Sequence, residues 1–106
     1  MNNVCLIGRI VRDLELENKE GTNSRCKFTL AVDRNGTEST DFINCIAWGK
    51  VAENLTKYQK KGNQISIVGS IRADSYQNKD GNNVYITEVV ADKITFLDKK
   101  DSNNNN

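Results

Sequence analysis

The sequence predicts a single all-β domain that also contains one helix. Three observations support this prediction. The 106 residues suffice for one modest core, five segments have the apolar–polar alternation of strands, and one segment of about three turns has helical spacing instead. The mean hydropathy is −0.63 and no apolar run approaches the roughly 18 residues of a membrane span, so a membrane protein is not expected.

The first three strands are expected over residues 4–12, 25–34 and 41–50. Turn-forming residues at 17–24 and 35–40 separate them, and the second of these turns opens with Asn-Gly. Gly8 lies inside the first expected strand and predicts a bulge or a sharp bend there.

The helix is expected over residues 51–61, where Val51, Leu55 and Tyr58 form an apolar stripe at helical spacing. Lysines in its last turn and Gly62 as its stop favour this assignment. Two more strands follow, over residues 64–76 and 84–97, joined by a hairpin tip with Asp-Gly. Three strands, a helix and two strands are the order of a five-stranded Greek-key OB barrel with the helix between strands three and four.

Residues 1–98 are therefore predicted to form the OB-fold domain. Residues 99–106 are charged and then all Asn after Ser102, and because they lack apolar anchors we expect a disordered tail. The N-terminus "MNNVCLIGRI" has no basic region before its apolar stretch and no small-residue cleavage site. A secretory signal is therefore not expected, and the cytoplasm is the expected compartment.

The sequence disfavours catalysis, metal binding and any cofactor. It contains no histidine and no C-x-x-C, so Cys5, Cys26 and Cys45 are predicted to be small buried residues in a reducing compartment. General-base chemistry most often uses imidazole. Asp13 and Glu17 belong to the densest acidic group, but such alternating charges are usually solvated surface.

The third expected strand carries more apolar groups than a half-buried strand needs. Phe42, Asn44 and Trp48 share one parity, while the core is already supplied by the other parity, which holds Ile43, Cys45 and Ala47. Tyr76 lies on the polar parity of the fourth strand. Exposed rings beside cations are what stacking on single-stranded bases requires. The pattern fits a core or subunit contact equally well.

The distribution of charge favours a nucleic-acid surface more than the net charge of +1 does. Residues 42–79 carry six basic and two acidic side chains, whereas residues 80–106 carry three basic and five acidic ones. Lys50, Arg72 and Lys79 lie within a few positions of the aromatic residues. The positive region therefore coincides with the strands that bear the rings.

Several stretches closely resemble the bacterial and phage single-stranded DNA-binding proteins: "MNNVCLIGRIVRDLE", "DFINCIAWGKVAENLTKYQKKGNQISIVGSIR" and "TEVVAD". The resemblance covers nearly everything from Met1 to about Leu97. It implies base stacking on aromatic positions, phosphate contact by the lysine after the Trp-Gly step, and basic positions on the first and fourth strands. The resulting nucleic-acid-binding set is Phe42, Trp48, Tyr76, Lys50, Arg72, Arg9, Asn44, Lys79 and Arg34.

The resemblance also implies a function and an assembly. Such a protein coats single-stranded DNA without sequence specificity during replication, recombination and repair, in the bacterial cytoplasm at the nucleoid or in a phage-infected cell. It forms a homotetramer in which N-terminal strands pair between subunits. Many members carry a further tryptophan after the second strand, where this chain offers only Arg34 as the nearest cation. Members usually end in an acidic, apolar tip, and because this chain ends in "DSNNNN", recruitment of repair and replication proteins through a tip is not expected.

Two alternatives remain open from the sequence. An OB-fold assembly module would bind protein partners and touch nucleic acid only weakly, which the low net charge favours. A small nuclease would need a carboxylate metal site, for which Asp13, Glu15 and Glu17 are the only dense acidic group.

Overall fold

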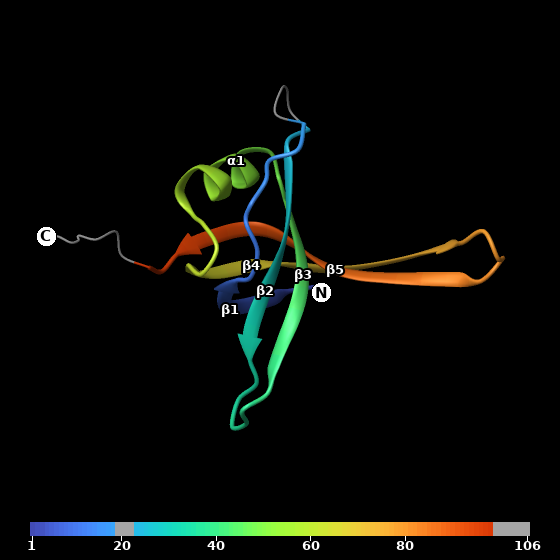
Figure 1. Ribbon diagram of the computed structural model, residues 1–106, viewed down its shortest axis with the longest axis horizontal. Helices are drawn as coiled ribbons and strands as arrows, with labels where there is room; N and C mark the ends of the chain where they lie inside the picture. The colour runs from blue at the N-terminus through green and yellow to red at the C-terminus, as the bar shows by residue number, and fades with distance from the viewer. Residues whose placement is uncertain (19–22, 99–106) are drawn as a thin grey trace, which may run out of the picture.

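The computed structural model describes residues 1–18 and 23–98, and in these residues it contains five strands and one helix (Figure 1). They are β1 (Val4–Ile10), β2 (Arg25–Asp33), β3 (Thr40–Trp48), α1 (Gly49–Tyr58), β4 (Gln64–Gln77) and β5 (Asn83–Phe96). Every element lies within three residues of its predicted position. The expected tail at 99–106 lies outside the described residues.

The strands close into a barrel in the order β1-β2-β3-β5-β4. Neighbouring strands are antiparallel except for β3 and β5, which run parallel, with Cys45 opposite Val89. β1 pairs with β4 from Val4 to Arg9 and closes the ring. The closed ring and the helix between the third and fourth strands confirm the predicted OB barrel.

The core lies inside the barrel, where every second side chain of each strand points inward. Its fully buried aliphatic side chains are Ile10, Leu30, Leu55, Ile65 and Ile67. Burial of one such side chain contributes about 1.5–3 kcal/mol to folding. The helix packs against β2, β3 and β5, and so covers part of the same core.

The helix differs from the prediction at both ends and in its buried face. It ends at Tyr58, where the Gln59 N–H donates to the Leu55 carbonyl and Gln59 itself is extended. Gly62 has a φ of 93° and lies in a following turn, where its N–H donates to Ile10. Ala52 and Leu55 form the buried face, whereas Tyr58 is 46% exposed, so its expected place in the apolar stripe was wrong.

Two glycines allow strands to approach closely. Of the bulge or bend predicted at Gly8, the bulge is absent from the pairing with β4, because β1 keeps an even register with β4 through this residue. A Cβ at Gly8 would instead overlap the Ala31 carbonyl oxygen. The register shift lies between Val68 and Gly69, where a Cβ would overlap the Val90 carbonyl oxygen.

The three cysteines are free thiols, but only two of them are buried. Cys26 and Cys45 lie in the core. Cys5 is exposed on β1, so the prediction that it is buried was wrong for the single chain. The alternation explains the difference, because Val4 and Leu6 already fill the inward positions of β1 and pack against the core.

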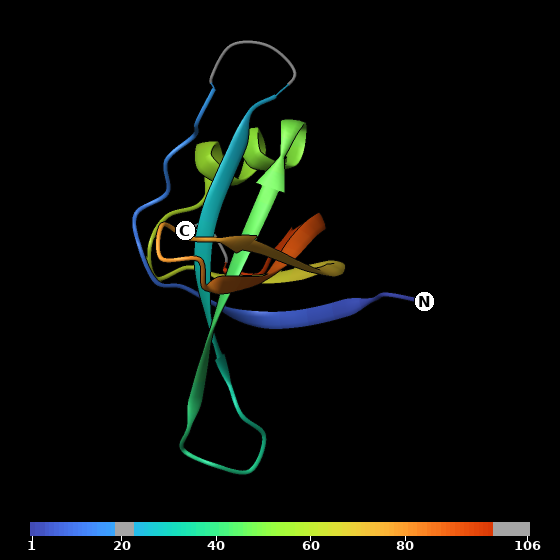
Figure 2. The same cartoon turned by 90° about the vertical axis from the view of Figure 1, so that its right-hand side faces the viewer.

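The β4–β5 hairpin continues beyond the barrel as a two-stranded arm, defined here as residues 71–88. Figure 1 shows the arm projecting to the right, and Figure 2 looks along it, with the β2–β3 hairpin reaching out below the barrel. Residues 71–83 are all exposed, as expected for a ribbon that has no core of its own.

Candidate nucleic-acid interface

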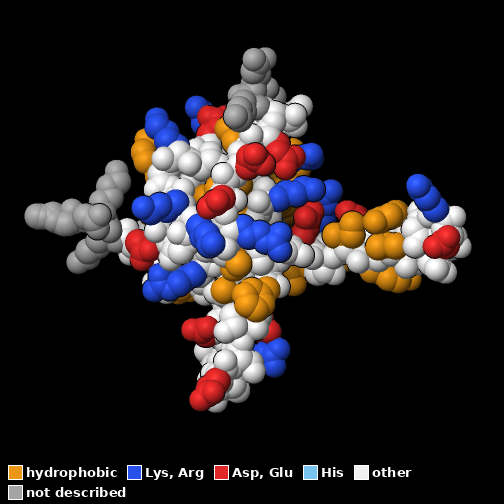
Figure 3. Space-filling model, viewed as in Figure 1, with side chains coloured by type: hydrophobic (Ala, Val, Ile, Leu, Met, Phe, Trp, Pro, Cys, Tyr) orange, Lys and Arg blue, Asp and Glu red, His pale blue; other side chains and the backbone are white. Residues whose placement is uncertain are grey.

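The candidate interface starts from the outward side chains of two paired strands. The register of β2 with β3 places them in cross-strand pairs: Arg25 with Trp48, Lys27 with Ile46, Thr29 with Asn44, and Ala31 with Phe42. Ile46 shares this parity but is buried, with 3% of its surface exposed. We call this surface the β2–β3 face. Figure 3 shows Lys and Arg side chains gathered over the middle of the molecule, where β2 and β3 cross in Figure 1.

Trp48 lies at one end of the β2–β3 face and is 38% exposed. The guanidinium carbon of Arg25 lies 5.8 Å from the centre of the indole ring, within the range of a cation–π interaction. Arg25 Nε also donates to Glu17 Oε1 at 2.8 Å. A partly exposed indole ring and a cation thus lie together at this end of the β2–β3 face.

Phe42 lies at the other end of the face and is 65% exposed, which excludes a role in the core of the single chain. Its cross-strand partner Ala31 is also the partner of Arg9 on β1. Arg9 and Phe42 line one shallow pocket together with Gln64. The structure therefore brings Arg9 beside Phe42, although the two are far apart in sequence.

Polar groups occupy the middle of the face. Thr29 Oγ1 donates to Asn44 Oδ1 at 3.3 Å, and both residues line a groove with Lys27, Arg12 and Glu88. Arg12, Arg25 and Lys27 were not predicted from the sequence. The β2–β3 register would have found two of them, since it pairs Arg25 with Trp48 and Lys27 with Ile46. Arg12 lies outside both strands and is found only from the lining of the groove.

The arm extends this surface. Directly paired residues share a face of the ribbon, so Arg72 and Tyr76 lie on the same side as Ile86 and Glu88, which line the groove with Asn44. Tyr76 is 54% exposed on that side. Arg72 Nε lies 3.3 Å from Asp74. Lys79 follows in the turn at the tip of the arm.

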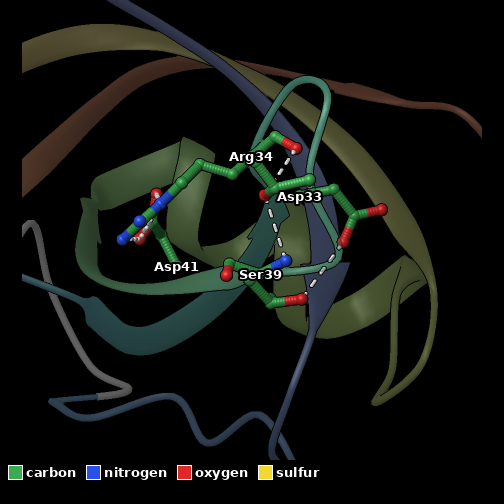
Figure 4. A network of polar contacts seen from close by, with 6 residues as sticks. Asp33, Arg34, Ser39 and Asp41 are labelled. Atoms are coloured by element: carbon green, nitrogen blue, oxygen red, sulfur yellow. Dashed lines mark hydrogen bonds and ion pairs between the residues drawn. The ribbon is translucent and has the colours of Figure 1, made fainter.

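Two predicted cations lie at the margins of the β2–β3 face. Lys50 is the second residue of α1, its side chain is 89% exposed, and its Nζ lies 3.7 Å from Glu53. Arg34 follows β2 and forms a tight ion pair with Asp41, with Nη2 2.7 Å from Oδ1 (Figure 4). Hydrogen bonding within this pair raises the pKa of Arg34 and lowers the pKa of Asp41.

The described residues contain no group of three or more His, Cys, Asp or Glu side chains that is arranged to hold a metal ion. Glu17, from the dense acidic group, instead forms an ion pair with Arg25.

Burial raises the pKa of the Cys45 thiol to about 12, and the negative charge of Glu88 adds to the shift. No helix in the described segments is long and apolar enough to cross a bilayer.

The fold is shared with a solved structure. A Plasmodium falciparum single-stranded DNA-binding protein in complex with single-stranded DNA superimposes with a TM-score of 0.77. The match covers 92% of this chain and 96% of that chain, at 24% sequence identity. This likeness supports the OB barrel described above.

Sequence comparisons give closer relatives. The chain is 46% identical over 110 residues to single-stranded DNA-binding protein 1 of Streptococcus pyogenes, covering 99% of this chain and 85% of that protein. It is 43% identical over 106 residues to single-stranded DNA-binding protein 1 of Clostridium acetobutylicum, covering 94% and 96% respectively. The sequence model of the single-strand binding protein family matches residues 1–97. The chain therefore belongs to the single-strand binding protein family.

Proposed function

We propose that this protein is not an enzyme and that it coats and protects single-stranded DNA without sequence preference during replication, recombination and repair. The observation that carries the proposal is the juxtaposition of exposed rings and cations on the β2–β3 face and the arm. Phe42 and Tyr76 leave more than half of their surface in solvent, and bases stack on such rings whatever their identity. Family membership supports the same conclusion.

Each part of the surface has a role in this proposal. Phe42, Trp48 and Tyr76 stack successive bases, and Asn44 offers a polar group between the first two. The cations neutralise the phosphates and release counterions. They are Lys50, Arg72, Arg9, Lys79 and Arg34 from the sequence, and Lys27, Arg25 and Arg12 from the geometry.

Trp48 is the only tryptophan in the chain, so its fluorescence reports on this site alone. Titration with oligo-dT at low salt should quench the emission, because a stacked base changes the surroundings of the indole. The quench should reverse as salt is added, since the phosphate contacts weaken. Unchanged emission from folded protein at low salt, together with no binding of a labelled oligo-dT, would contradict the proposal.

The proposal includes a homotetramer in which β1 pairs between subunits. β1 pairs with β4 along one edge, but with β2 only at Arg9 and Ile10, so residues 4–8 leave their other edge without a strand partner in the described residues. Such an open edge is a template for another strand. Ile7 and Val68, on adjacent strands, are 55% and 41% exposed and add apolar surface to cover.

Native mass spectrometry tests the assembly. A mass of four 11.9 kDa chains is expected. Replacement of the exposed Ile7 by Glu, which puts a charge on the apolar surface that a neighbouring subunit would cover, should lower the assembly state. A species that stays monomeric at every concentration would contradict the tetramer.

We further propose that residues 1–98 form the binding domain and that the protein acts in the cytoplasm.

A further inference from the structure

Five of the eight cations of the proposed interface are paired with carboxylates in the described residues. The structure records five ion pairs within the described residues, and each involves a cation of this surface: Arg9 with Asp98, Arg25 with Glu17, Arg34 with Asp41, Lys50 with Glu53, and Arg72 with Asp74. The two shortest, at 2.8 and 2.7 Å, are Arg25 with Glu17 and Arg34 with Asp41. A phosphate that approaches either arginine therefore meets a carboxylate already in place.

The Arg34–Asp41 contact has the geometry that a phosphate would use. Arg34 Nη2 donates to Asp41 Oδ1 at 2.7 Å, and Nε donates to the two carboxylate oxygens at 3.2 and 3.4 Å. An arginine fork binds carboxylate and phosphate oxygens in this same way. Figure 4 shows how the turn holds the pair, with the Arg34 N–H donating to the Ser39 carbonyl at 3.0 Å.

The Arg25–Glu17 contact is fixed by the backbone. The Glu17 N–H donates to the Arg25 carbonyl at 2.8 Å, and the Arg25 N–H donates to the Glu17 carbonyl at 3.0 Å. This bridge places the Glu17 carboxylate beside the same guanidinium that lies over Trp48. The acid therefore lies at the edge of a proposed stacking site.

We propose that Glu17 and Asp41 are built-in competitors of the DNA phosphates, occupying Arg25 and Arg34 until a strand displaces them. The inference rests on the proposed function and deepens it. Both pairs are partly exposed, with side-chain exposures of 35% to 61%, and ion pairs in such surroundings are weak enough to be exchanged. Lys27 and Lys79 are in no ion pair within the described segments, so they are available for the first contact.

The consequence is a change in affinity and in salt dependence. When a phosphate replaces a carboxylate on arginine, one anion is exchanged for another, so the contact yields less net attraction than a bare cation would. Removing the competing carboxylate should therefore tighten binding to single-stranded DNA. It should also steepen the slope of the log binding constant against log salt concentration by about 0.7 for each arginine that becomes available.

The experiment compares Asp41→Asn and Glu17→Gln with matched controls that remove the same charge. Glu38→Gln lies in the same turn as the Arg34–Asp41 pair and Glu15→Gln lies two residues before Glu17, and neither glutamate is in an ion pair within residues 1–18 and 23–98. Binding of labelled oligo-dT is followed by fluorescence anisotropy at several salt concentrations. Asp41→Asn and Glu17→Gln should each bind about twofold to fivefold more tightly than their controls.

A double variant separates competition from general charge. In an Arg34→Gln background, Asp41→Asn should give no more gain than Glu38→Gln, because the cation that it unmasks is missing. If wild-type protein binds oligo-dT but each variant matches its control, the competition is overturned while the proposed function stands. A gain from Asp41→Asn that persists without Arg34 also overturns it. Wild-type protein that does not bind oligo-dT overturns the proposed function itself.

Discussion

Phe42 and Tyr76 expose 65% and 54% of their surface although the core has no need of them. Large rings in water are unfavourable unless a partner covers them, and a row of such rings marks an interaction surface. Their neighbours on that surface are cations and short polar side chains, among them Arg9, Arg72 and Asn44. At the scale of the residue, the surface is suited to flat bases on a charged backbone.

Replacement of Tyr76 by alanine should weaken oligo-dT binding by about 1–3 kcal/mol, because one stacked base loses its support. Tyr85→Ala is the matched control. Tyr85 is 75% exposed on the same arm, but its register partner is Ser75, so it lies on the opposite side of the ribbon. Anisotropy titrations of both variants test this, and equal losses would contradict the assignment of one binding side.

The three thiols should differ in reactivity. Burial raises the pKa of Cys26 and raises that of Cys45 to about 12, so the reactive thiolate is disfavoured in both buried residues, whereas Cys5 is exposed. Ellman's reagent should therefore modify one thiol per native chain rapidly in dilute protein and three in denaturant. Three fast thiols in native protein would contradict the burial of Cys26 and Cys45.

Single residues were predictable from sequence only where the alternation of side chains along one strand decides which side of the sheet they occupy. Parity placed Phe42 and Trp48 on one side of β3, and the structure keeps them there. Arg25 and Lys27 were missed because their importance depends on the pairing of β2 with β3, which parity within one strand does not contain. Asp41 was missed for the same reason, since it meets Arg34 across the hairpin.

At the scale of the element, the arm and the bulge at its base position Tyr76. The register shift between Val68 and Gly69 occurs where β4 leaves the barrel, and Gly69 lies against the Val90 carbonyl. A bulge adds local twist and re-aims the strand that follows it. The direction in which Arg72 and Tyr76 point therefore depends on this register shift.

Gly69→Ala should destabilise the fold by about 1–3 kcal/mol, because the added Cβ overlaps backbone that no side-chain rotation relieves. Ser75→Ala, at an exposed position farther along β4, should change stability by less than about 0.5 kcal/mol. Chemical denaturation of the two variants measures the difference. A Gly69→Ala protein as stable as Ser75→Ala would contradict the close approach.

The strands were predictable because their alternation reflects which side chains the barrel buries. The end of the helix was not, because Gly62 resembles a helix stop in sequence but serves the next turn, where it binds Ile10. The bulge predicted at Gly8 is absent from the pairing of β1 with β4, and Gly8 lies instead in close contact with the Ala31 carbonyl. Both glycines respond to residues distant in sequence, and a local pattern does not report such contacts.

At the scale of the whole molecule, a net charge of +1 conceals a surface on which cations and acids alternate. The order of elements sufficed to predict the barrel, but charge composition did not predict that each ion pair recorded in the described residues engages an interface cation.

The double variant Phe42→Ala with Trp48→Ala distinguishes a DNA-binding face from a subunit contact. It should lose most oligo-dT affinity while native mass spectrometry shows an unchanged assembly. Collapse to monomer would favour the assembly module instead.

Photo-crosslinking to an oligonucleotide that carries 5-bromodeoxyuridine, followed by peptide mass spectrometry, tests the central claim most directly. Crosslinks are expected at Phe42, Trp48 and Tyr76, which lie on the β2–β3 face and one side of the arm. None is expected at Tyr58, the last residue of α1, or at Phe96, the last residue of β5, whose rings lie 6.4 Å apart. Crosslinks confined to Tyr58 and Phe96 would contradict the claim.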